Sequence, residues 1–240
     1  MTDDGIANTV WVIDCNETNA KISALFDTVD YLYIADGHHR AASAVKVGLK
    51  RREQYPGFDG NEEFNFFLAV LFDCNELEIM DYNRVMKDLN GNTPEQFIEK
   101  ISEKFSVEVH GDSAYKPEKS HTFGMLLGGK WYKLTAKDGT FDANDPVDSL
   151  DVSILQNNLI SPVLDIHDPR TDKRIDFVGG IRGLGELERR VNEDMCLAFS
   201  MYPTTLEELM NIADAGKVMP PKSTWFEPKL LSGLFIHKLK

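Results

Sequence analysis

The stretch Tyr31-Leu32-Tyr33-Ile34-Ala35-Asp36-Gly37-His38-His39-Arg40 joins an apolar run to a charged turn. The apolar run predicts a buried strand, and the residues from Arg40 onward predict a helix to about Gln54. A glycine in a strand-to-helix turn lets the backbone adopt a positive φ and approach a ligand closely. The first N–H groups of the helix favour an anion in the same space, and the planar guanidinium of Arg40 suits phosphate. The pattern therefore predicts a phosphate pocket bordered by titratable side chains.

The same turn has two other interpretations. Asp36 could cap the helix, with Gly37 forming the turn and the two histidines lying on the surface. Asp36, His38 and His39 could instead bind a metal ion, because histidine and carboxylate suit zinc or a harder cation. Three ligands on so short a loop rarely reach one ion. A Mg²⁺ ion bridged by Asp36 and nucleotide phosphates is therefore the better metal hypothesis.

The composition suits a protein with a substantial core and disfavours nucleic acid as a partner. The chain has 240 residues, 42% hydrophobic and 27% charged, which suits one large domain or two small ones. With a formal net charge of −13 the surface repels DNA and RNA, so a phosphate site must be a local basic pocket. The longest apolar run, residues 66–72, is too short to span a bilayer. Three cysteines without Cys-x-x-Cys spacing indicate buried free thiols and a cytoplasmic protein.

Strands and helices are mixed without strict alternation, which predicts the α+β class with a mixed sheet and helices. We expect strands at residues 9–14, 31–35, 64–72, 76–85, 106–110, 175–178, 195–201 and 234–239. We expect helices at residues 17–29, 40–54, 93–105, 148–166, 184–192 and 205–215. Apolar segments on both sides of Gly128-Gly129 predict a β-hairpin.

Helix caps and acidic runs complete the local prediction. Thr93 before Pro94 marks a helix start, and Asp148 or Ser149 is expected to cap the helix at 148–166. The run Thr204-Thr205-Leu206-Glu207 matches a capping box. The acids between Asp138 and Asp151 indicate a solvated loop.

A second candidate motif is Lys222-Ser223-Thr224, which follows two prolines. Lys222 is a mobile cation, and the two hydroxyls can donate hydrogen bonds, as a transferring phosphoryl group requires. The alternative is a proline-stiffened loop with a solvent-exposed lysine.

The glycine-rich segment at residues 179–185 and Arg84 each have two possible interpretations. The glycines of residues 179–185 could let backbone N–H groups approach an anion, assisted by Arg182, or could form a tight turn without a ligand. Their spacing is not the dinucleotide fingerprint. Arg84 lies in an apolar strand, which is unusual for a charged group, and it either lines the pocket or pairs with an acid.

The Asp-Gly-His-His-Arg run, followed by Ala44, resembles the large prokaryotic family catalogued as domain of unknown function 1015. It also resembles the free-serine kinases, whose fold is akin to ParB partition proteins and sulfiredoxin. The resemblance implies a ParB/sulfiredoxin-like nucleotide-binding core with an added hairpin and helices. It implies that the phosphates of ADP or ATP, with Mg²⁺ as a further candidate, bind to Asp36, Gly37, His38, His39 and Arg40. Sulfiredoxin chemistry is not implied, because His38 stands where sulfiredoxins carry cysteine.

The kinases have a similar Pro-Lys-x-Thr segment, so the resemblance places Lys222, Ser223 and Thr224 on the substrate and phosphate side of one shared cleft. The implied activity is phosphoryl transfer to a small, amino-acid-like hydroxyl acceptor, with His38 or His39 as an acid or hydrogen-bond donor. One alternative is a regulatory module that binds a nucleotide or anion without chemistry. Another is a metal-assisted hydrolase that uses Asp36, His38 and His39.

The resembling kinases take their catalytic base from an upstream His-Glu pair, and this chain contains no His-Glu pair. Family members also extend further on the amino-terminal side. We therefore expect one compact domain, residues 1–240, that is the carboxy-terminal part of a longer protein or a naturally shortened member. A missing amino-terminal segment of the same protein would supply the base. The alternative division has parts at 1–60 and 136–240 around an inserted segment at 61–135.

Overall fold

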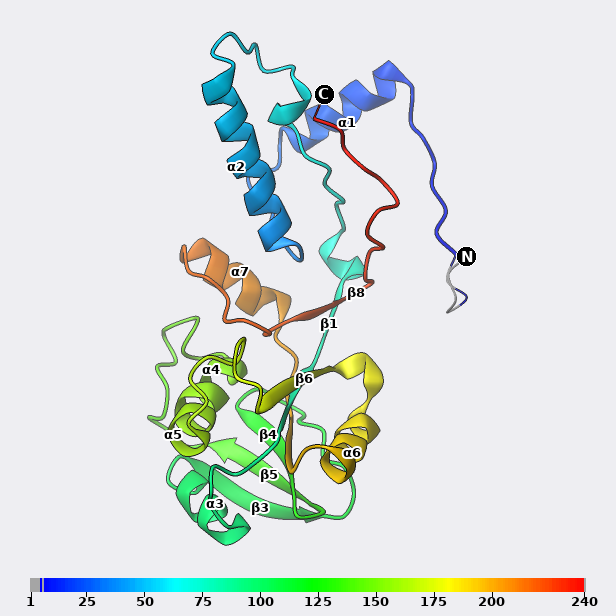
Figure 1. Ribbon diagram of the computed structural model, residues 1–240. Helices are drawn as coiled ribbons and strands as arrows, with labels where there is room; N and C mark the ends of the chain where they lie inside the picture. The colour runs from blue at the N-terminus through cyan, green and yellow to red at the C-terminus, as the bar shows by residue number, and fades with distance from the viewer. Residues whose placement is uncertain (1–4, 6, 240) are drawn as a thin grey trace. The chain divides into compact units, whose positions relative to one another are not determined.

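A six-stranded antiparallel sheet organises the larger of two compact units. The computed structural model describes residue 5 and residues 7–239, and the chain divides into units of residues 1–37 and 38–240. The large sheet has the strand order β3-β5-β4-β7-β2-β6, and β1 pairs with β8 in a two-stranded sheet (Figure 1). The strands are β1 (Glu78–Met80), β2 (Tyr82–Met86), β3 (Phe105–Gly111), β4 (Thr122–Leu127), β5 (Lys130–Ala136), β6 (Ile175–Gly179), β7 (Leu197–Ser200) and β8 (Trp225–Glu227).

The helices confirm the predicted α+β class. The first unit contains α1 (Asn16–Phe26). The second unit contains α2 (His38–Gln54), α3 (Pro94–Ile101), α4 (Asp151–Leu155), the π-helical turn η3 (Gln156–Ile160), α5 (Ser161–Leu164), α6 (Leu184–Glu193) and α7 (Leu206–Asp214). Short 3-10 helices occur at η1 (Glu63–Asn65), η2 (Cys74–Glu76) and η4 (Gly180–Arg182). None of the described helices is long and apolar enough to cross a membrane.

Both faces of the large sheet are buried, because successive side chains of a strand point to opposite faces. Met86 of β2 belongs to the core that α3, α4 and α5 cover, whereas its neighbour Val85 belongs to a second core with Leu187 of α6. In β7, Phe199 belongs to the same core as Met86, and its neighbour Ala198 belongs to the second core. Figure 1 shows α6 on one side of the sheet and α3, α4 and α5 on the other. The six-stranded sheet therefore lies between two apolar cores.

Local sequence signals predicted several of these elements. The β4–β5 hairpin turns at Gly128 and Gly129, whose φ angles are 58° and 76°. The α3 helix starts with a capping box, in which the Gln96 N–H donates to Thr93 Oγ1 and the Thr93 N–H donates to Gln96 Oε1. A positive φ and a cap depend on residues a few positions apart, so a short sequence window contains the necessary information.

Two predicted helix starts are wrong in detail. The α7 capping box uses Thr205 and Glu208, one residue later than predicted, because the hydroxyl of Thr204 donates to the Ser223 carbonyl instead. The helix of residues 148–166 begins at Asp151 after an N-cap at Leu150 without a side-chain cap bond. The π-helical turn η3 then interrupts this helix.

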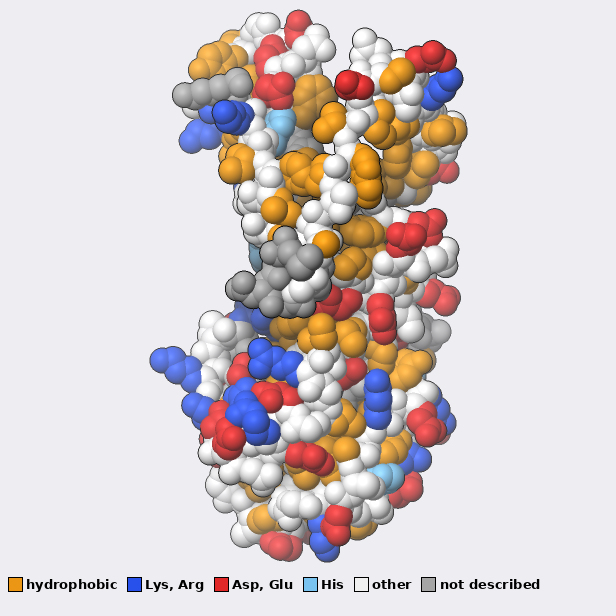
Figure 2. Space-filling model, turned by 90° about the vertical axis from the view of Figure 1, so that its right-hand side faces the viewer, with side chains coloured by type: hydrophobic (Ala, Val, Ile, Leu, Met, Phe, Trp, Pro, Cys, Tyr) orange, Lys and Arg blue, Asp and Glu red, His pale blue; other side chains and the backbone are white. Residues whose placement is uncertain are grey.

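The strands predicted at 9–14, 31–35, 64–72 and 234–239 are wrong, because the structure forms no ladder with these segments. A strand needs a partner, and apolar composition alone does not supply one. Their side chains remain exposed, as Trp11 at 81% and Ile236 at 78% illustrate, and Figure 2 shows many apolar side chains at the surface. Cys15 and Cys74 are also exposed, contrary to the prediction of buried thiols.

Candidate functional site

The turn before α2 has the backbone that the sequence predicts. Gly37 has a φ of 86°, and its N–H donates to Asp36 Oδ1 at 2.8 Å. The α2 helix begins at the next residue, so the free N–H groups of its first turn follow the glycine directly. The side chains of His38, His39 and Arg40 are exposed and make no hydrogen bond or ion pair with any described residue. Their donors are therefore available to a ligand.

The metal interpretation of this turn finds no support in the described residues. No group of three or more histidine, cysteine, aspartate or glutamate side chains there is arranged to hold a metal ion. Asp36 and Gly37 end the first unit, and His38 begins the second. The shared cleft of this turn with Lys222 stays a prediction.

The Lys222 segment forms a turn that three hydrogen bonds hold in place. Lys222 has a φ of 60°, a left-handed backbone that costs a non-glycine residue about 1–2 kcal/mol. Arg84 Nη2 donates to the Lys222 carbonyl at 3.1 Å, Ser223 Oγ donates to the Pro220 carbonyl at 2.6 Å, and Thr204 Oγ1 donates to the Ser223 carbonyl at 3.2 Å. These hydrogen bonds therefore stabilise the unusual backbone conformation of Lys222.

These bonds change the role expected for one hydroxyl. Ser223 is buried and its hydroxyl donates within the turn, so it is not a free donor toward a phosphate. Thr224 is half-buried and makes no hydrogen bond with a described residue, so it keeps its predicted availability.

The buried side chain of Arg84 donates a hydrogen bond to the backbone of the Lys222 turn. It lies in β2 between β7 and β6, is 4% exposed, and donates to the carbonyls of Tyr82 and Lys222. Burial lowers the pKa of its guanidinium to about 10, which leaves it charged at neutral pH. Among the described residues its hydrogen bonds go to backbone carbonyls, and the Coulombic attraction of the Asp151 carboxylate opposes the lowering of its pKa.

The ammonium group of Lys222 is exposed above an aromatic surface. Its Nζ donates to Tyr82 Oη at 3.3 Å and lies 5.7 Å and 5.8 Å from the ring centroids of Tyr82 and Phe177. No described carboxylate forms an ion pair with it. In a chain of net charge −13, an unpaired cation held over aromatic rings is suited to an anion.

Two glycines where β6 ends and η4 begins make room for neighbouring side chains. A Cβ on Gly179 would approach the Trp225 ring to 2.6 Å, and one on Gly180 would collide with the Asp81 carboxylate. Arg182 of η4 forms an ion pair with Glu186 of α6 at 3.6 Å. Of the two interpretations, the tight turn is the one that these contacts support.

Sequence analysis missed the buried carboxyl of Asp151, the first residue of α4, which it assigned to a solvated loop. Asp151 is 8% exposed, and its Oδ1 accepts the N–H of His121 at 2.7 Å. Its Oδ2 is buried without a hydrogen-bond partner in the described structure. Burial raises the pKa of Asp151 to about 7, against the opposing effects of the His121 N–H and of Arg84. An acid in the first turn of an apolar helical pattern was the available signal.

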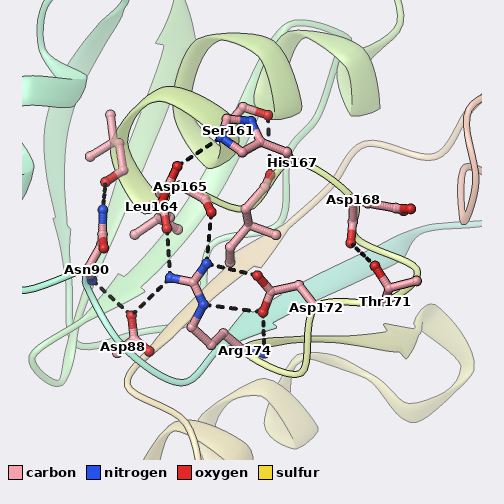
Figure 3. Close-up of polar contacts among 12 residues, drawn as sticks. Asp88, Asn90, Ser161, Leu164, Asp165, His167, Asp168, Thr171, Asp172 and Arg174 are labelled. Carbon is pink, nitrogen blue, oxygen red and sulfur yellow. Dashed lines mark hydrogen bonds and ion pairs between the residues drawn. The ribbon is translucent and has the colours of Figure 1, made fainter.

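A second polar cluster, around Arg174, is structural. The α5 helix ends at Leu164, and the residue that caps it, Asp165, has a φ of 57°. Arg174 donates to the carbonyls of Leu164 and Asp165 at 3.0 Å and 2.8 Å and forms an ion pair with Asp172 at 2.8 Å (Figure 3). Figure 3 also shows Asp88 beside the same guanidinium, at 3.8 Å. Because its donors serve the helix end and these acids, the Arg174 cluster offers little to a ligand.

Comparison with known proteins identifies the family and finds several solved structures with limited similarity to this chain. The model of the family described as Protein of unknown function (DUF1015) matches residues 1–153. None of the curated proteins matches the chain. Among solved structures, a free serine kinase mutant in complex with AMP has 17% identity and a TM-score of 0.45, over 88% of this chain and 79% of the kinase chain.

Two further structures are similar to the same degree. The ADP complex of the free serine kinase mutant gives the same identity of 17%, TM-score of 0.45 and coverage of 88% and 79%. A conserved hypothetical protein from Pyrococcus furiosus has 20% identity and a TM-score of 0.44, over 83% of this chain and 71% of that chain. Similarity at this level does not assign an activity.

Proposed function

The chain belongs to the DUF1015 family of proteins of unknown function, and from its own side chains we propose that it binds nucleotide phosphates as a phosphotransferase module. The nucleotide is ADP or ATP. The acceptor is a small, amino-acid-like compound with a hydroxyl group. The residues proposed to bind the nucleotide are Asp36, Gly37, His38, His39, Arg40, Lys222 and Thr224.

The Gly37 turn is the observation that carries the proposal. A glycine at a φ of 86° makes the turn, and the start of a 17-residue helix and an exposed arginine three positions after the glycine supply two kinds of hydrogen-bond donor for an anion. Backbone N–H groups at a helix start favour a phosphate, and a guanidinium adds charge-assisted hydrogen bonds. Because Oδ1 of Asp36 accepts the Gly37 N–H, its second oxygen is the one available to a phosphate-bound Mg²⁺ ion.

The Lys222 turn supports the phosphoryl-transfer part of the proposal. An exposed ammonium without a carboxylate partner can stabilise the charge of a transferring phosphoryl group. Thr224 adds a hydroxyl. His38 or His39 would donate a hydrogen bond or a proton, because both side chains are exposed at this turn.

A second candidate function is binding without chemistry, as a regulatory module for a nucleotide or anion. Transfer to a hydroxyl needs a base within hydrogen-bond distance of the acceptor. An ammonium without a carboxylate neighbour can bind phosphate in either function, but no described carboxylate lies at Lys222 to act as that base, and this favours the second function.

One experiment on the full 240-residue chain distinguishes the two functions. Calorimetric titration with ADP and ATP measures binding, and a radiolabel assay with serine and related hydroxyl compounds measures transfer. Binding together with labelled acceptor supports the phosphotransferase. Binding without labelled acceptor supports the regulatory module, and failure to bind either nucleotide contradicts the phosphotransferase and a module that binds these nucleotides.

A further inference from the structure

Three aromatic side chains from three strands meet beside the Lys222 turn. Tyr82 of β2 contacts Phe177 of β6 and Trp225 of β8 edge-on, with ring centroids 5.7 Å and 5.4 Å apart. All three rings are half-buried, so part of each reaches solvent. The Trp225 ring packs on the backbone of Gly179, where a Cβ would approach it to 2.6 Å. Strands of the two sheets therefore bring these three rings together, and we call them the aromatic patch.

Three cations surround the aromatic patch. Lys229 Nζ lies 4.9 Å from the Trp225 centroid, Arg84 Cζ lies 5.6 Å from that of Phe177, and Lys222 Nζ lies near Tyr82 and Phe177. Neither lysine forms an ion pair with any residue that the structure describes.

Glu227, the acid nearest to Lys229 in sequence, already accepts a hydrogen bond at each carboxylate oxygen. Glu227 Oε1 accepts the indole N–H of Trp225 at 2.7 Å, and its Oε2 accepts the backbone N–H of Lys229 at 3.1 Å. In a chain with 39 acids and 26 bases, two lysines without acidic partners beside three rings form a local basic surface.

We propose that the aromatic patch is the base subsite of the nucleotide, with Lys222 and Lys229 binding its phosphates. This inference rests on the proposed function and names where the base binds. A nucleobase can stack on an aromatic side chain whichever base it is, because every base has a π-face. When the phosphates draw the two ammonium groups away from the rings, the rings become free to contact the base. A ligand with both a planar ring and phosphate uses the whole surface.

A mononucleotide fits this surface better than a nucleic acid strand. Each additional phosphate of a strand would meet the field of a protein with net charge −13, whereas the patch offers only two unpaired lysines. The arrangement thus points to a single nucleotide of two or three phosphates.

The test compares ADP, adenosine, inorganic pyrophosphate and a ten-nucleotide DNA strand as ligands of the full chain by calorimetry. Wild-type protein is expected to bind ADP at least tenfold more tightly than pyrophosphate or adenosine. Phe177→Leu should weaken ADP at least fivefold and leave pyrophosphate unchanged, whereas Lys229→Gln should weaken both. Lys130→Gln, an exposed lysine on β5, is the matched control and should change neither.

The outcomes separate this inference from the proposed function. If ADP does not bind at all, the proposed function fails. If ADP binds and depends on Arg40 but not on Phe177 or Lys229, only the base subsite is overturned. Tighter binding of the DNA strand than of ADP also overturns it. Should Phe177→Leu not fold, Trp225 provides a second measurement in otherwise wild-type protein: ADP should quench its fluorescence, and a Trp225→Phe variant should lose that change.

Discussion

The guanidinium of Arg84 donates a hydrogen bond to the backbone carbonyl of Lys222, 138 residues later in the chain, at 3.1 Å. This bond joins a central strand of the sheet to a left-handed turn and fixes the position of the Lys222 ammonium over Tyr82. Arg84 therefore acts as a positioning residue: its charge is buried, and its donors serve the protein backbone.

Arg84→Lys should weaken both stability and ADP binding. Lysine keeps the buried charge but lacks the planar set of donors that reaches the carbonyls of Tyr82 and Lys222. Hydrogen bonds of a charged group are worth about 1.5–3 kcal/mol, and in a chain of this size each kcal/mol lowers the Tm by about 2–4 °C. Thermal unfolding and calorimetry measure the two effects. Arg182→Lys, at an exposed ion pair, is the control; equal losses in the two variants would contradict the positioning role.

Asp151→Asn should stabilise the protein increasingly as the pH rises. The pKa of Asp151 is about 7 in the folded chain, above its unfolded value of about 3.9, so the folded state binds the proton of this carboxyl more tightly. The protonated carboxyl therefore contributes fully to wild-type stability below about pH 4, and this contribution is lost as the pH rises to about 7. Asparagine does not titrate, and its amide oxygen still accepts the His121 N–H.

Urea unfolding at pH 5, 6, 7 and 8 measures this difference. The free energy of unfolding of the variant relative to wild type should grow by a few kcal/mol from pH 5 to about pH 7, at about 1.4 kcal/mol per pH unit, and level off above pH 7. Asp138→Asn, at an exposed position, provides the control. Parallel curves for Asp151→Asn and wild type would show that this carboxyl does not titrate near neutrality.

Gly179→Ala and Gly185→Ala should have opposite effects on stability. A Cβ at Gly179 would meet the Trp225 ring at 2.6 Å, and such overpacking typically costs about 1–3 kcal/mol. At Gly185, in the first turn of α6, a Cβ meets nothing within 4 Å, and alanine should stabilise the helix by about 0.5–1 kcal/mol. Thermal unfolding measures both changes; a stable Gly179→Ala variant would mean that the glycine does not serve to accommodate Trp225.

Arg40 and Lys222 should contribute cooperatively to ADP binding if both contact one nucleotide, as proposed. A double-mutant cycle with Arg40→Ala and Lys222→Ala measures the interaction energy between the two side chains, and residues that share a ligand typically show about 0.5–3 kcal/mol. The calorimetric losses of the two single variants should therefore not add in the double variant. Additive losses within about 0.3 kcal/mol would place the two side chains in independent sites.

Sequence analysis succeeded where the deciding residues lie close together in the chain. Gly128 and Gly129 specify a hairpin by their own backbone conformations, and Thr93 caps α3 through a residue three positions later. The failures involve distant partners. Residues 64–72 are apolar enough for a strand, but the structure supplies no ladder for them, and β8 pairs with β1 about 150 residues earlier in the chain.

In the candidate site, too, sequence predicted the features that depend on neighbouring residues and missed those that depend on distant ones. The local backbone of Gly37 and the start of α2 could be predicted from five adjacent residues. The internal hydrogen bond of Ser223 and the burial of Asp151 could not, since each depends on packing between segments far apart in sequence.

The most direct test of the proposed phosphate site is calorimetric titration of ADP into wild type, Arg40→Ala and Lys50→Ala. Lys50→Ala is the control, because it removes an exposed lysine towards the other end of α2. Loss of one charge-assisted contact costs about 1.5–3 kcal/mol, so Arg40→Ala should bind ADP at least about tenfold more weakly, and Lys50→Ala should match wild type. Equal ADP affinity of Arg40→Ala and wild type would contradict a phosphate site at Gly37 to Arg40.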